Sequence, residues 1–190
     1  MLQSYQLFFE GKMGKMCCDN IEVRNSAKIV LLNDENKLLL IGIDDKNIKD
    51  QKGEYKGRFW QLIGGKIEDQ ESIEDALKRE LFEETGLTEK YVEFGPIIWQ
   101  GELNLIMYGI QTRVKQKFVL THLKRKADLN LNHLTQEEKG TVTELKWFSL
   151  KEIEQSKEII YPGLLPVYLK EILDGHIPDK PIEIDLAKTR

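Results

Sequence analysis

Two short aliphatic runs near the start of the periodic part of the chain flank four polar residues. Residues 27–32 (AKIVLL) and 37–43 (KLLLIGI) are rich in aliphatic side chains, and Asn-Asp-Glu-Asn occupies 33–36 between them. Runs of this length that are bounded by turn-forming residues favour β-strands joined by a hairpin. We therefore predict two paired strands with a turn at 33–36.

The next region alternates between a polar loop, a short strand and a helix. Residues 44–57 are polar and lead into the aromatic pair Phe59 and Trp60, which is typical of a surface loop followed by a strand. Loops of this kind often line a binding site. The pattern then predicts a helix from about Ser72 to Thr85, ended by Gly86 as its C-terminal cap.

The remaining pattern predicts a single α/β domain over 21–190, with an N-terminal arm at 1–20 that has no sustained period. Strand-like runs cover 92–100, 105–120 and 142–148, a helix is indicated at 164–173, and the stretch 179–185 (DKPIEID) is expected to be an extended tail. Leu7, Phe8 and Phe9 in the arm could pack onto a second subunit, so we leave a homodimer open.

Composition narrows the class of protein. The 190 residues include 41% hydrophobic and 32% charged side chains, which suits one domain of ordinary size. The formal net charge of -4 gives no general attraction to a nucleic-acid backbone. We therefore expect no long nucleic acid as a ligand, whereas a small phosphorylated molecule held by a metal is compatible with this charge.

Cysteine usage and hydropathy bear on location. The two cysteines, Cys17 and Cys18, are neighbours in the sequence, and a direct bridge between neighbours is strained. No window reaches the roughly 18 uninterrupted apolar residues needed to cross a membrane, and the N-terminus lacks a basic segment leading into an apolar signal core. We therefore expect a protein of the reducing cytoplasm with no membrane partner.

Three glutamates of the predicted helix do not fall on its solvent side. At about 100° per residue, Glu80 and Glu84 lie within the apolar arc and Glu83 lies at its border. The arc itself is marked by Ile73, Leu77 and Leu81. Carboxylates at this spacing repel one another, and turning them inward adds a desolvation cost. A cation should therefore sit among them.

The donor type selects the ion. Hard divalent cations such as Mg²⁺ or Mn²⁺ prefer oxygen ligands and leave coordination positions for water and substrate phosphate. Arg79 and Glu71 could orient the carboxylates. A Glu-rich surface helix that serves solubility is the ordinary interpretation of such a run, but the inward placement and the preceding Gly64 and Gly65 count against it.

The segment 65–87 resembles the Nudix box, G-x5-E-x7-R-E-U-x-E-E-x-G-U with U aliphatic, at every fixed position. The matching residues are Gly65, Glu71, Arg79, Glu80, Leu81, Glu83, Glu84, Gly86 and Leu87. The resemblance, to MutT-like Nudix hydrolases, covers about an eighth of the chain and implies an α/β/α sandwich around a mixed β-sheet. The common Pro-Gly-Gly run is replaced here by Ile63-Gly64-Gly65, so the fixed φ of proline is lost.

The resemblance also implies roles for the box residues. Glu80, Glu83 and Glu84 would bind the metal with the backbone carbonyl of Gly65, and Arg79 and Glu71 would support them. The catalytic base could be Glu83 or Glu80 within the box. Related enzymes often use a glutamate from a later loop, and we favour Glu138 among the three candidates Glu137, Glu138 and Glu144.

The substrate contacts are less well determined by the sequence. Lys66 and Arg58 are our candidates for binding substrate phosphate, and Arg24 is another basic residue that could do so. Four aromatic residues could stack on a base, although aromatic side chains in strands are more often core. These are Trp60, Trp99, Trp147 and Phe148.

The expected activity is divalent-metal-dependent hydrolysis of a diphosphate linkage in a nucleoside triphosphate or another nucleoside diphosphate derivative. The alternative is a non-catalytic Nudix-fold module that senses a nucleotide or acts as an adaptor, which would be expected to lose box carboxylates. An isopentenyl diphosphate isomerase is disfavoured by the intact box. The sequence does not rank oxidised nucleotides, nucleotide sugars and dinucleoside polyphosphates as substrates.

Overall fold

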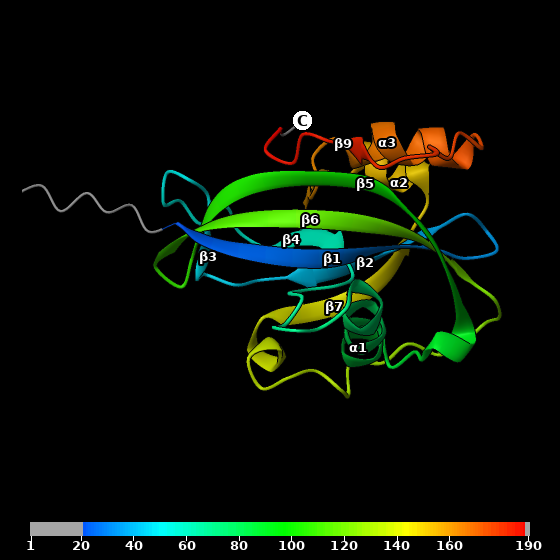
Figure 1. Cartoon of the computed structure of the whole chain (residues 1–190), viewed down its shortest axis with the longest axis horizontal. Helices are drawn as coiled ribbons and strands as arrows, with labels where there is room; N and C mark the ends of the chain where they lie inside the picture. Colours follow the sequence, from blue (N-terminus) through cyan, green and yellow to red (C-terminus); the bar gives the residue numbers. More distant parts are fainter. Residues whose placement is uncertain (1–20, 189–190) are drawn as a thin grey trace, which may run out of the picture.

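The computed structural model describes residues 21–188, so the expected arm at 1–20 lies outside the described residues. Helix α1 (Ile73–Thr85) covers one side of a mixed sheet, and α2 (Leu150–Gln155) and α3 (Leu165–Leu173) cover the other (Figure 1). The predicted α/β/α sandwich is confirmed. The strands are β1 (Glu22–Leu32), β2 (Leu38–Ile43), β3 (Ile48–Lys49), β4 (Phe59–Leu62), β5 (Val92–Met107), β6 (Ile110–Leu123), β7 (Val142–Phe148), β8 (Ile159–Ile160) and β9 (Ile182–Glu183).

The sheet has the order β3-β5-β6-β1-β2-β4-β8, with β7 added to β2 and β9 added to β5. The predicted hairpin forms, but its strands pair only at Leu32 and Leu38. Beyond that pair β1 runs parallel to β6, while β2 pairs with β4 and β7. The strands of the hairpin therefore separate, and β1 and β4 form two different walls.

Two expectations from the sequence needed correction. The run 105–120 is interrupted, because Tyr108 and Gly109 adopt positive φ values of 52° and 83° and turn the chain. Its first residues belong to β5, which forms a long antiparallel hairpin with β6. Helix α2 was not predicted; it begins at a capping box in which Ser149 and Glu152 bond each other's backbone amides.

The core consists of two apolar clusters, one on each side of the sheet. Trp60, Trp99 and Phe148 belong to the cluster beneath α2 and α3, and each is at most 2% exposed. Their interpretation as core residues is therefore confirmed. Leu77 and Leu81 of α1 belong to the other cluster. Each such side chain contributes on the order of 1.5–3 kcal/mol of burial free energy, which fixes α1 against the sheet.

Candidate metal centre and substrate cavity

Helix α1 has the ends that the sequence predicted. The hydroxyl of Ser72 accepts a hydrogen bond from the Asp75 amide at 3.1 Å, and Gly86 closes the helix in the left-handed region with φ of 74°. Because Leu81 faces the core, residues in the same arc face it too. Glu80 and Glu84 are accordingly only 5% and 4% exposed.

Burial makes both carboxylates costly to ionise. It raises the pKa of Glu84 to about 8, although Lys28 opposes this shift. The Glu84 Oε2 atom accepts a hydrogen bond from the Gly64 amide at 2.6 Å. Burial also raises the pKa of Glu80, against the opposing effect of Arg79. Two buried carboxylates with raised pKa values are suited to binding a cation, because the positive charge would hold them ionised.

Arg79 ties the helix to the preceding loop. Its Nε and Nη2 atoms donate to the two oxygens of Glu71 at 2.8 Å each, which is a bidentate pair. Nη1 donates to Glu80 at 2.7 Å and to Glu83 at 3.1 Å. The hydrogen bonds from Arg79 lower the pKa of Glu71. The arrangement orients Glu80 and Glu83 from one guanidinium group.

The bend before the helix is held by β1 rather than by a proline. The amides of Ala27 and Ile29 donate to the carbonyls of Gly65 and Ile63 at 3.0 and 2.9 Å. Gly64 has φ of 115°, a conformation that favours glycine. A Cβ atom at Gly65 would lie 2.5 Å from Glu80 Oε1. The bend therefore places the Gly65 backbone directly over the Glu80 carboxylate.

A third carboxylate reaches the helix from far along the chain. Glu138, in a short 3₁₀ turn (Glu138–Gly140), offers an oxygen that lies within 4.8 Å of oxygens of Glu80 and Glu84. Its Oε2 atom accepts hydrogen bonds from the amide and hydroxyl of Thr135 at 2.9 and 2.8 Å. This all-oxygen donor set, two-thirds of it buried, fits a hard divalent cation such as Mg²⁺ or Mn²⁺.

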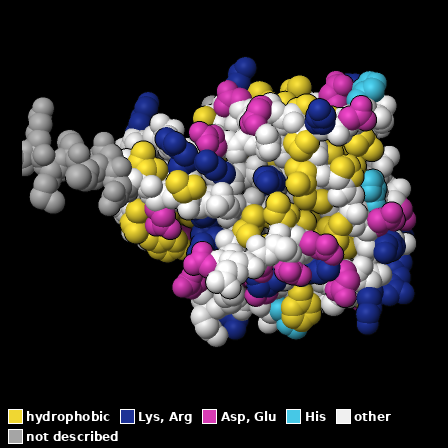
Figure 2. Space-filling model, in the orientation of Figure 1, with side chains coloured by type: hydrophobic (Ala, Val, Ile, Leu, Met, Phe, Trp, Pro, Cys, Tyr) yellow, Lys and Arg dark blue, Asp and Glu magenta, His cyan; other side chains and the backbone are white. Residues whose placement is uncertain are grey.

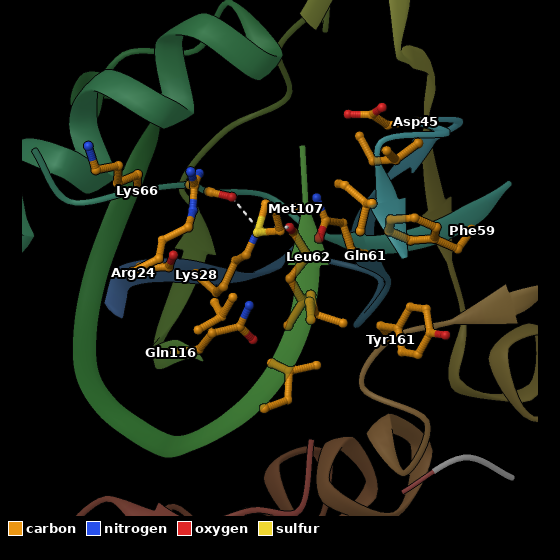
Figure 3. A pocket seen from close by; sticks show the side chains of 18 of the residues that line it. Arg24, Lys28, Asp45, Phe59, Gln61, Leu62, Lys66, Met107, Gln116 and Tyr161 are labelled. Atoms are coloured by element: carbon orange, nitrogen blue, oxygen red, sulfur yellow. Dashed lines mark hydrogen bonds between the residues drawn. The ribbon is translucent and has the colours of Figure 1, made fainter. Parts of the chain in front are cut away.

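The carboxylates open onto a cavity of about 680 Å³ between the walls formed by β1, β5 and β6 and by β4. Figure 3 shows Gln61, Gln116 and Tyr161 among its lining side chains. Phe59 and Tyr161 meet edge to face with ring centroids 5.4 Å apart. The cavity is thus lined by charged, aromatic and amide-bearing side chains, and its volume is in the range of small-molecule sites.

The two basic residues that the sequence suggested for phosphate binding, Arg58 and Lys66, differ in position. Arg58 does not line the cavity; its guanidinium contacts Thr143, Glu144 and Glu158 at 3.1, 2.6 and 2.9 Å. Lys66 lines the cavity and pairs with Glu68 at 3.0 Å.

Lys28 was missed by sequence reasoning, because only the fold buries it beside the box. Its ammonium group donates to the carbonyls of Leu62, at 3.3 Å, and Gly64. Gln61, Gln116 and Tyr161 were missed for the same reason, because no motif links segments so distant in sequence.

The surface gives two further observations. Over the face in Figure 2, acidic and basic side chains are interspersed, with no continuous basic stripe across that view. Within residues 21–188 no helix is both long enough and apolar enough to cross a membrane.

The NUDIX domain family model matches residues 23–168, which include the whole box, the carboxylate cluster and both cavity walls. The chain belongs to the Nudix family. The resemblance drawn from the box is confirmed, and the match extends well beyond the 23 residues that carried it.

Individual relatives are more distant. The Nudix chain is 38% identical over 52 residues to an 8-oxo-dGTP diphosphatase of Buchnera aphidicola, a match that spans 27% of this chain and 42% of that protein. Among solved structures it resembles a MutT protein from Methanosarcina mazei, with 20% identity, 84% and 99% of the two chains covered and a TM-score of 0.56.

An ADP-ribose pyrophosphatase from Streptococcus suis is similar at 18% identity, with 85% and 98% of the two chains covered and a TM-score of 0.51. At such identities the structural likeness establishes the Nudix fold and leaves the substrate open.

Proposed function

We propose that this Nudix chain hydrolyses a diphosphate linkage in a nucleoside triphosphate or another nucleoside diphosphate derivative, with Mg²⁺ or Mn²⁺ as cofactor. One observation carries the proposal: Glu80, Glu84 and Glu138, from two distant segments, lie together in the lining of a cavity of about 680 Å³. The complete set of box carboxylates argues against the sensor or adaptor alternative.

The residues divide into those that hold the ion and those that orient them. Glu80, Glu83, Glu84 and the Gly65 carbonyl would hold the metal, which when bound neutralises phosphate charge and lowers the pKa of a coordinated water. Arg79 fixes the rotamers of Glu80 and Glu83 by its hydrogen bonds. A preorganised set of this kind avoids reorganisation during the reaction.

The same contacts distinguish the candidates for the base. Glu80 and Glu83 each accept a hydrogen bond from the Arg79 guanidinium, so one oxygen of each carboxylate is already occupied by a charged donor. Among the described residues, Glu138 accepts hydrogen bonds only from the neutral donors of Thr135, both on its Oε2 atom. We therefore assign the water's proton to Glu138 Oε1.

The experiment is product release by the purified protein with Mg²⁺ or Mn²⁺ across nucleoside triphosphates, oxidised triphosphates, nucleotide sugars and dinucleoside polyphosphates. Glu84→Gln should lower the rate by about 100-fold or more while the fold is kept, because the amide preserves shape and the Gly64 contact. Glu74→Gln is the matched control, since Glu74 lies on the same helix with a side chain 70% exposed.

Calorimetric titration with Mn²⁺ gives a second reading of the site. Glu84→Gln should weaken Mn²⁺ binding, and Glu74→Gln should leave it unchanged. A Glu84→Gln protein with full activity and full Mn²⁺ affinity would refute the metal assignment. Absence of turnover across the panel, together with tight nucleotide binding, would favour the sensor alternative.

A further inference from the structure

Strand β1 directs a line of polar side chains into the cavity. Alternate residues of a strand share a face, and Arg24, Ser26 and Lys28 all line the cavity wall. Figure 3 shows the side chains of Arg24 and Lys28 rising from this strand. Arg24 is close enough to lower the pKa of Lys28, an effect secondary to burial and to the opposing carboxylates. Two cations therefore share one wall.

Arg24 differs from its basic neighbours in its contacts. Among residues 21–188, its guanidinium makes no hydrogen bond and no ion pair. Arg79 is committed to Glu71, and Lys66 is paired with Glu68. Lys28 uses two of its three donors on backbone carbonyls. The wall thus retains one whole guanidinium and one ammonium donor for a ligand.

The charge balance of this wall depends on the carboxylates opposite. Burial lowers the pKa of Lys28, and the negative charges of Glu84, Glu80 and Glu138 oppose that shift. Two of these carboxylates, Glu80 and Glu84, are also among the donors that would hold a divalent cation. A cation bound there would satisfy them and leave Arg24 and Lys28 uncompensated, so an anion is the complementary ligand. A guanidinium binds the oxygens of a phosphate through its planar fork of donors.

We propose that Arg24, with Lys28 beside it, binds the terminal phosphate of the substrate, so that the site prefers nucleoside triphosphates to nucleotide sugars. This inference rests on the proposed function. A terminal phosphate monoester carries a charge of about −1.5 to −2 near neutral pH, whereas the corresponding end of a nucleotide sugar is an uncharged sugar. The uncharged group would leave the guanidinium without an ionic partner.

The test compares substrates that share a nucleoside, ATP with ADP-ribose and GTP with GDP-mannose, in the presence of Mg²⁺. Arg24→Met should lower kcat/KM for the triphosphates by about 10- to 100-fold, the range expected for losing hydrogen bonds to a charged group. The nucleotide sugars should change by less than about threefold. Most of the loss should appear in KM, because the contact is already made in the bound substrate.

Two further variants separate the phosphate contact from charge and folding. Arg24→Lys keeps the charge without the fork and should restore part of the triphosphate activity. Lys115→Met is the matched control: Lys115 is exposed on β6, beside the partner position of Arg24, and does not line the cavity. It should behave as the unaltered protein on every substrate.

The failures of the two proposals are distinguishable. Equal losses on both substrate classes, no loss on either, or a preference of the unaltered protein for nucleotide sugars would overturn the role of Arg24. If the unaltered protein hydrolyses no substrate, the proposed function fails, and Arg24 is tested by calorimetric binding of tripolyphosphate in Mn²⁺. Binding should then be about tenfold weaker in Arg24→Met, and unchanged binding would overturn the inference.

Discussion

Adding one methyl group at each of two adjacent glycines should separate catalysis from folding. In Gly65→Ala the new Cβ would lie 2.5 Å from Oε1 and 2.8 Å from Cδ of Glu80. The carboxylate would have to retreat by about 0.9 Å to restore an ordinary 3.4 Å contact. Glu80 is buried and its Oε1 atom is held by Arg79 at 2.7 Å, so the displacement disturbs the whole cluster.

The size of the effect follows from that displacement. A misplacement of about 1 Å in a catalytic group can cost on the order of 100-fold in rate, so we expect kcat/KM to fall by about that factor and Mn²⁺ affinity to fall with it. Thermal stability should change little, because the methyl meets the end of a side chain. The assays are steady-state kinetics, calorimetry and thermal unfolding.

Gly64→Ala is the contrasting variant. There the Cβ would lie 2.2 Å from the backbone oxygen of Ala27, and φ of 115° is unfavourable for alanine. Backbone atoms cannot rotate away, so strain and overpacking together should cost roughly 2–6 kcal/mol of unfolding free energy. Equal stability of the two variants, or a Gly65→Ala protein with unaltered activity and Mn²⁺ affinity, would refute the reasoning.

Three further changes test other parts of the site. The folded-state pKa of Glu84 is raised from 4.5 to about 8, so the metal-free fold should lose stability as pH rises through that interval. Metal affinity should grow by up to about tenfold per pH unit until pH 8, because the metal competes with the proton. Unfolding and Mn²⁺ titrations from pH 5 to 9 check both expectations, and flat profiles in both would contradict them. Arg58→Met should lower unfolding free energy by about 1 kcal/mol because its partners are half exposed, with KM unchanged; a large rise in KM would restore its predicted substrate role. Glu138→Gln should lower kcat by about 100-fold or more, while Glu137→Gln should have little effect. Equal rates of product release by these two variants would exclude Glu138 as the base.

The local sequence was sufficient to predict the helix ends and the direction in which its side chains point. The ends of α1 follow from Ser72 and Gly86, whose backbone preferences act within one turn. The inward placement of Glu80 and Glu84 follows from the helical period, and their burial agrees with it. The interruption of the run 105–120 was missed, because the turn at Tyr108 and Gly109 lies between residues that suit a strand equally well on either side.

The sequence by itself therefore determined the family, the helix and the carboxylates that it carries, since a contiguous motif places its own residues through fixed helical geometry. Tertiary structure alone decided which distant groups meet them. The parallel pairing of β1 with β6 forms the wall that bears Arg24 and Lys28, and the 3₁₀ turn brings Glu138 to the cluster. The tertiary structure also pairs Arg58 with Glu144 and Glu158. Such contacts depend on strand pairing and charge balance between segments far apart in the chain, which no local pattern encodes.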